Sequence, residues 1–208
     1  MAHIYAFGSV CRGEVTPDSD IDLLAVTGGF DSRFDSELYS VYSYTRISEI
    51  WREGNPFAWH LSLEARLLHS PDSSDYLRDL GSPAAYRRAR DDCQQFFALF
   101  EGSANSLRAV TNSPTFELST IFLAVRNFAT CYSLGEGSPD FSRHSALRLR
   151  ASSLAISESA FAILERARLL CTRGKGHTIS HEDTTAAVSE LTQIEDWMRC
   201  LLTTVRKS

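Results

Sequence analysis

The sequence has no strong excess of charge of either sign and no long apolar run. Its 208 residues include 21 Lys and Arg against 26 Asp and Glu, a formal net charge of −5. A nucleic-acid clamp spread over the whole protein needs a large positive excess, so that class is excluded. No apolar run reaches the roughly 18 residues that span a bilayer. The first ten residues lack the basic start and apolar stretch of a signal peptide. We therefore expect a cytoplasmic protein with no membrane partner.

Cysteine is sparse and shows no paired spacing. The five cysteines are an odd number, and no Cys-x-x-Cys pair occurs among them. This pattern argues against both a disulfide framework and a zinc site. We expect reduced, mostly buried thiols at Cys11, Cys93, Cys131, Cys171 and Cys200.

Charge is distributed unevenly along a chain of ordinary globular composition, with 43% hydrophobic residues. Residues 1–83 contain 6 Arg and 13 Asp and Glu, a balance of −7. Residues 84–208 contain 15 Lys and Arg and 13 Asp and Glu, a balance of +2. This asymmetry predicts two domains, 1–83 and 84–208, with the boundary at Gly81-Ser82-Pro83.

Hydrophobic periodicity changes between the two parts. The first part alternates with a period of two over 3–7, 21–26 and 57–68, which predicts strands, whereas a helix is expected to end near Glu53-Gly54 and a short one to cover 72–80. Asn55-Pro56 is interpreted as a break. The second part shows helical stripes within 85–111, 117–134, 155–171 and 191–205, and Ser180 with Asp183 forms a capping box expected to begin the last of these helices. The fold class predicted is α+β: a small mixed β-sheet domain followed by an all-α bundle of four to five helices.

The chemically informative stretch is residues 7–24, FGSVCRGEVTPDSDIDLL. Gly8-Ser9 at a strand end lets backbone N–H groups approach a phosphate, and Arg12 can add a charge-assisted contact. Asp20 and Asp22 lie two apart on a strand, so both carboxylates project to one face. Two carboxylates that close repel each other unless a cation lies between them, and Mg²⁺ is the natural occupant. A phosphate cradle beside a metal pair is what phosphoryl or nucleotidyl transfer requires.

This string resembles the signature of the nucleotidyltransferase superfamily of the polymerase beta type, and in particular the minimal and the aminoglycoside (kanamycin) nucleotidyltransferases. The resemblance implies that Gly8 and Ser9 bind the triphosphate, together with Arg12 and Ser19. It also implies that Asp20 and Asp22 ligate Mg²⁺, with Mn²⁺ as an alternative.

Such enzymes commonly use a third carboxylate on a later strand. In a strand over 57–68, alternation places Glu64 on the same side as His60 and Ser62, away from the apolar side. Glu64 is therefore the candidate third carboxylate, as a metal ligand or as general base on the attacking hydroxyl. His60 is interpreted as a structural histidine, as is His144.

The helical part loosely resembles the bundles that accompany such nucleotidyltransferases, including the HEPN group. In that group an Arg followed a few residues later by His marks a ribonuclease site. Arg126 has no His at that spacing, so we do not predict ribonuclease activity. The bundle could wall the cleft, bind the acceptor or form a homodimer face.

The function predicted is Mg²⁺-dependent transfer of a nucleoside monophosphate, AMP in the first instance, from a nucleoside triphosphate to a hydroxyl acceptor with release of pyrophosphate. The acceptor is left open among a small molecule such as an aminoglycoside, a protein and RNA. The alternative is a toxin–antitoxin-like interaction protein that keeps the nucleotidyltransferase fold and pairs through its helical bundle.

Overall fold

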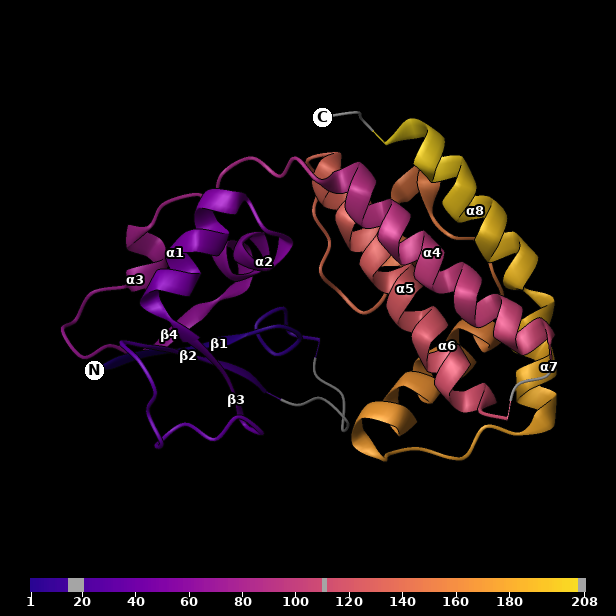
Figure 1. The fold of residues 1–208 in the computed structure, drawn as a ribbon, viewed down its shortest axis with the longest axis horizontal. Helices are drawn as coiled ribbons and strands as arrows, with labels where there is room; N and C mark the ends of the chain where they lie inside the picture. The colour runs from indigo at the N-terminus through magenta and orange to yellow at the C-terminus, as the bar shows by residue number, and fades with distance from the viewer. Residues whose placement is uncertain (15–20, 110–111, 206–208) are drawn as a thin grey trace. The chain divides into compact units, whose positions relative to one another are not determined.

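Four strands form one mixed sheet in the first part of the chain, and helices make up the second part (Figure 1). The computed structural model describes residues 1–14, 21–109 and 112–205. The chain divides into two compact units, Met1–Arg87 and Arg88–Ser208. The α+β class predicted from the sequence is confirmed. Among the described helices, none is both long and apolar enough to cross a membrane.

The sheet places the end of its first strand beside the start of its second strand. Its strands are β1 (Ala2–Phe7), β2 (Asp22–Thr27), β3 (Tyr39–Ser43) and β4 (Arg66–His69), in the order β3-β2-β1-β4. β1 is antiparallel to β2 and β4, whereas β2 and β3 are parallel. The β1–β2 register pairs Phe7 with Asp22, so the residue before Gly8 faces the first residue of β2.

Short helices cover one face of this sheet (Figure 1). α1 (Tyr44–Glu53) begins at an N-cap Ser43 and ends at Gly54, whose φ of 64° is the left-handed conformation typical of a glycine cap. The predicted helix end at Glu53-Gly54 is confirmed. α3 (Tyr76–Asp79) lies within the predicted segment 72–80. The core between sheet and helices includes buried side chains from both layers: Tyr5, Phe7, Leu24, Val26, Ile47, Ile50, Trp51 and Leu61.

The predicted strand over 57–68 is wrong for most of its length. Pro56–Glu64 is a helix, α2, and β4 contains only Arg66–His69. Asn55 caps this helix by accepting a hydrogen bond from the Phe57 N–H at 2.8 Å, and Pro56 occupies the first turn. An Asn-Pro pair is thus a helix start here rather than a break, because proline's missing N–H costs nothing in a first turn.

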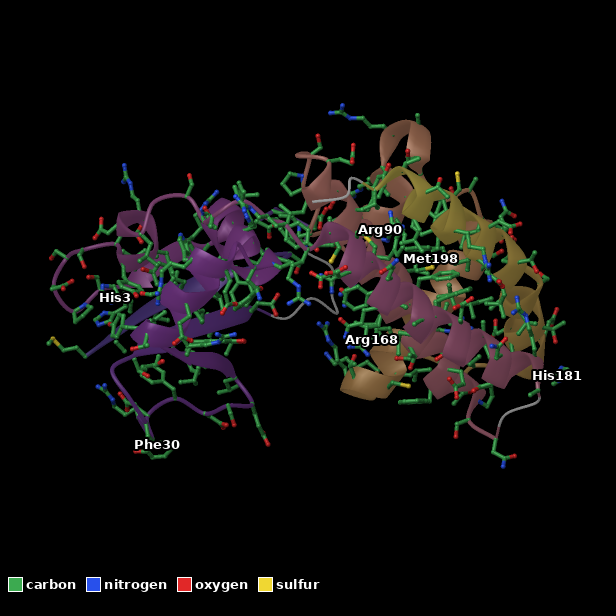
Figure 2. All side chains as sticks on the ribbon, turned by 45° about the horizontal axis from the view of Figure 1, so that its top comes forward. His3, Phe30, Arg90, Arg168, His181 and Met198 are labelled. Atoms are coloured by element: carbon green, nitrogen blue, oxygen red, sulfur yellow. The ribbon has the colours of Figure 1, made fainter. Side chains whose placement is uncertain are left out.

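The second unit is built from five helices in its described residues: α4 (Ala89–Arg108), α5 (Pro114–Gly135), α6 (Glu158–Arg173), α7 (His181–Ser189) and α8 (Leu191–Thr204). Two short 3₁₀ turns, η1 (Ser145–Arg148) and η2 (Arg150–Ser152), precede α6. α5 packs against both α4 and α6. The predicted stripe of α5 is buried at Leu118, Ile121, Phe122, Val125 and Ala129. Met198 of α8 is fully buried inside this unit (Figure 2).

The predicted capping box exists, but it begins a different helix. The Ser180 hydroxyl accepts from the Asp183 N–H, and the Asp183 carboxylate accepts from the Ser180 N–H, at the start of α7. α7 ends at Ser189, before the apolar stripe of α8 begins. In its last turn the Ser189 hydroxyl donates to the Ala186 carbonyl at 2.7 Å. Such back-bonding competes with the backbone ladder and favours a bend or end at this point.

The thiols are less buried than the sequence predicted. All five cysteines are free, as expected. Cys93 and Cys131 are buried, Cys11 is half-buried, and Cys171 and Cys200 are exposed. The exposed pair lie on α6 and α8.

Candidate active site

The segment after β1 is a tight turn that leaves backbone donors available. Gly8 adopts φ +77°, and Cys11, Arg12 and Gly13 then donate to carbonyls three residues earlier at 3.1–3.2 Å. The Glu14 N–H closes the turn on the Ser9 carbonyl at 2.9 Å. Within the described residues, neither the Ser9 nor the Val10 N–H donates a hydrogen bond. Neighbouring N–H groups of this kind form an anion-binding concavity.

Asp22 lies directly against Gly8. Side chains of a strand alternate, so Asp22 shares a face with Leu24 and Val26, which belong to the core under the helices. A Cβ atom added at Gly8 would overlap the Asp22 carboxylate and would lie 3.1 Å from its Cγ. Glycine is therefore required here twice, for its backbone conformation and for the space that the carboxylate occupies.

A second group of charged residues meets beside the same turn. Arg12 donates from Nε to Glu14 at 2.9 Å and from Nη1 to Oε2 of Glu64 at 2.5 Å. Glu64 is the last residue of α2, and His60 lies one turn earlier with Nε2 2.8 Å from the same Oε2 atom. The side chains of Arg12, Glu64 and His60 are 20%, 11% and 14% exposed. This is a shielded ion-pair network in which screening by water is weak.

The Cys11 thiol lies within electrostatic reach of both Asp22 and the Arg12–Glu64 pair. Burial raises the pKa of the Cys11 thiol, Arg66 and Arg12 oppose that effect, and the carboxylates of Glu64 and Asp22 add to it. One thiol therefore senses both carboxylates. Burial by itself lowers the pKa of Arg12, but its hydrogen bonds and charge interactions with Glu14 and Glu64 outweigh this and leave that pKa raised.

The structure thus brings Gly8, Ser9, Arg12, Asp22 and Glu64 to one end of the sheet. Asp20 and Ser19, which complete the predicted site, lie outside the described residues. Over 1–14, 21–109 and 112–205, no three His, Cys, Asp or Glu side chains are grouped as a metal site. The carboxylate oxygens of Asp22 are nevertheless hard ligands of the kind that Mg²⁺ prefers. Because Gly8 has no Cβ atom, there is space for this carboxylate beside the turn.

The expected third carboxylate is not on a later strand. β3 reads Tyr-Ser-Val-Tyr-Ser and β4 reads Arg-Leu-Leu-His, so neither contains an acid. Glu64 is the last residue of α2, the helix capped by Asn55, and it lies two residues before β4. Because Glu64 lies on a helix, the residues on its face also differ from the prediction. His60, four residues earlier, contacts Glu64, whereas Ser62 is exposed.

Sequence reasoning missed two members of this group. The sequence predicts a structural role for His60 and indicates none for Glu14. The signal for His60 was its position four residues before Glu64, which becomes meaningful only in a helix. Glu14 bonds to a side chain two residues away inside an irregular turn, a contact that no periodicity reveals.

Residues 2–75 match the family model of the nucleotidyltransferase domain. The match spans β1 to β4 and about a third of the chain. No curated protein matches the chain. The resemblance of the second unit to HEPN bundles stays a prediction. Its Arg126 donates from Nη2 to the Phe141 carbonyl at 3.1 Å, a contact between two segments of that unit.

Proposed function

We propose that this protein is a Mg²⁺-dependent nucleotidyltransferase that moves a nucleoside monophosphate, AMP in the first instance, from a nucleoside triphosphate to a hydroxyl acceptor. The observation that carries the proposal is the Asp22 carboxylate packed against Gly8, beside a turn with available N–H groups. The domain match at residues 2–75 supports nucleotidyl transfer in general.

Each part of the turn has a role toward the triphosphate. The N–H groups of Ser9 and Val10 and the Ser9 hydroxyl donate to phosphate oxygens. Arg12 adds a guanidinium, whose planar donors suit phosphate better than a point charge does. These donors hold the α-phosphate in place for in-line attack, and positioning is the larger part of what a protein contributes to this chemistry.

Asp22, with Asp20 two residues before it, would hold the metal. Bound Mg²⁺ neutralises charge on the phosphates as it builds up in the transition state. The acidic pair would otherwise repel a polyphosphate, so triphosphate binding is expected to depend on the cation.

Glu64 is proposed to take the proton of the acceptor hydroxyl. Its Oε2 atom is engaged by Arg12 and His60, whereas Oε1 has no hydrogen-bond partner among the described residues. The acceptor oxygen forms a bond to the α-phosphorus, its proton moves to Oε1, and the bond to the β-phosphate oxygen breaks to release pyrophosphate. Direct ligation of the metal by Glu64 is the other role that the sequence suggested.

The test uses the purified full-length chain with Mg²⁺ and α-labelled nucleoside triphosphates. Acceptors offered are the protein itself, RNA and a panel of hydroxylated small molecules, and released pyrophosphate is measured in parallel. We expect labelling of one acceptor class, lost on chelation of the metal. The double variant Asp20→Asn with Asp22→Asn is expected to lose more than about a hundredfold in rate, because it removes the charges that hold the cation.

Asp31→Asn is the matched control, since Asp31 is a half-buried loop carboxylate paired with Arg33. It should transfer like the wild type. Unchanged transfer by the double variant would refute the mechanism. A wild type that neither binds a triphosphate nor releases pyrophosphate would instead favour the interaction-protein alternative.

A further inference from the structure

Two donors from different segments converge on a single oxygen of Glu64. Arg12 Nη1 approaches Oε2 from the turn after β1, and His60 Nε2 approaches it from within α2. To donate to an ionised carboxylate, His60 must carry its proton on Nε2. The carboxylate is thereby fixed from two sides, and its orientation in turn fixes the guanidinium that it holds.

We propose that His60 is a positioning residue which, through Glu64, sets the orientation of Arg12 toward the triphosphate. The proposal rests on the proposed function, in which Arg12 binds phosphate. It gives a role in that site to a histidine which the sequence alone marked as structural.

His60 is itself held rigidly. Its ring packs edge-on against Phe7, with centroids 5.5 Å apart, and against Phe57 at 6.4 Å. Phe7 is the residue immediately before Gly8 and pairs with Asp22 in the sheet. The histidine therefore links the helix to the strand end that carries the turn, and its Nε2 atom is a fixed reference point for Glu64.

The contact with Glu64 is needed to orient Arg12, because a second carboxylate, that of Glu14, lies in the same turn and also binds the guanidinium. Glu14, two residues away, already holds the Nε edge. Glu64 holds Nη1 from the opposite element, so the guanidinium plane is fixed by two carboxylates. Among the described residues, Nη2 has no hydrogen-bond partner and remains the edge that can meet a phosphate. With Glu64 free to rotate, the guanidinium could swing on Glu14 alone, and ordering it on binding would weaken affinity.

Two variants separate the hydrogen bond from the packing of the ring. His60→Phe keeps an aromatic ring against Phe7 and Phe57 but removes the donor, whereas His60→Gln keeps a side-chain N–H donor. His69→Gln is the control, since His69 is exposed on β4. Binding of Mg·ATP to the full-length chain is measured by calorimetry. We expect His60→Phe to weaken binding on the order of tenfold, as for the loss of one hydrogen bond to a charged group. His60→Gln should recover most of it, and His69→Gln should bind normally.

A double-mutant cycle with Arg12→Gln shows whether His60 acts through Arg12. We expect His60→Phe to cost no further affinity once Arg12 is absent. Additive losses would overturn the proposal and would mean that His60 acts by packing. So would a His60→Phe protein that binds Mg·ATP as the wild type does, although the proposed function would then stand.

A readout without nucleotide keeps the two proposals separable. In NMR spectra of the protein alone, the Arg12 Nη–H signals, which report the contact with Glu64, should lose their distinct shifts and exchange faster in His60→Phe, but not in His69→Gln. An unchanged Arg12 signal would overturn the positioning role. A wild type with an ordered Arg12 that does not bind Mg·ATP would refute the proposed function and leave the positioning observed.

Discussion

Replacing Gly8 by alanine should disturb the site through one atom. The added Cβ meets two costs, a left-handed backbone at φ +77° and an overlap with the Asp22 carboxylate. The backbone conformation costs an L-residue about 1–2 kcal/mol. Overpacking against a restrained neighbour adds about 1–3 kcal/mol. We therefore expect Gly8→Ala to lower the free energy of unfolding of the first unit by about 2–5 kcal/mol.

Gly13 supplies a control within the same turn. Its φ is +75°, but an added Cβ would have nothing within 4 Å. Gly13→Ala should therefore cost only the conformational part, about 1–2 kcal/mol. The difference between the two alanine variants isolates the contact with the carboxylate.

The assay is urea unfolding followed by tryptophan fluorescence. All proteins carry Trp197→Phe, so that the signal comes from Trp51 and Trp59 of the first unit. The double variant Gly8→Ala with Asp22→Ala removes the overlapping oxygens and leaves only the Asp22 Cβ, 3.4 Å from the new methyl group, which is ordinary contact. Gly8→Ala should therefore cost no more than Gly13→Ala in that background. Equal costs of the two single variants, or strict additivity with Asp22→Ala, would refute the reasoning.

Two further predictions concern stability away from the turn. Burial raises the pKa of Tyr5, so the folded protein favours its neutral form. This contribution is complete below the ordinary tyrosine pKa of about 10 and is lost as pH rises toward the folded value, so stability should fall in alkali and Tyr5→Phe should flatten that fall. Urea midpoints between pH 8 and 11 measure both, and parallel curves would contradict it. Ser180→Ala removes the capping box of α7 and should cost about 1 kcal/mol, seen as a lower melting temperature by circular dichroism; Ser189→Ala, which removes only a back-bond at the helix end, should not.

The prediction from sequence succeeded where a local pattern decides the outcome. The hairpin strands around residues 7–24, the glycine stop at Gly54 and the apolar stripe of α5 all follow from turn chemistry and period. It failed at Pro56–Glu64, because residues 59–64 alternate between apolar and polar side chains, and so short a run satisfies a strand as well as a helix. The start signal at Asn55-Pro56 is present in the sequence, but the same two residues also fit a break between elements.

The candidate site divides in the same way. Gly8, Ser9, Arg12 and Asp22 belong to one continuous string, so the sequence could propose them together, and their roles toward phosphate and metal stay predictions. Glu64 was expected on a strand and instead ends the helix α2, and its role, like the metal role predicted with Asp20, stays a prediction.

The sequence by itself therefore determined the α+β class, since hydrophobic period and turn residues depend on neighbours within a few positions. Only the tertiary structure decided what lies across from the turn. The ion pair between Arg12 and Glu64 joins residues 52 positions apart, and the fit of Asp22 against Gly8 depends on strand register. Contacts of this kind are set by how α2 packs on the sheet, and packing is a property of whole elements that no local pattern contains.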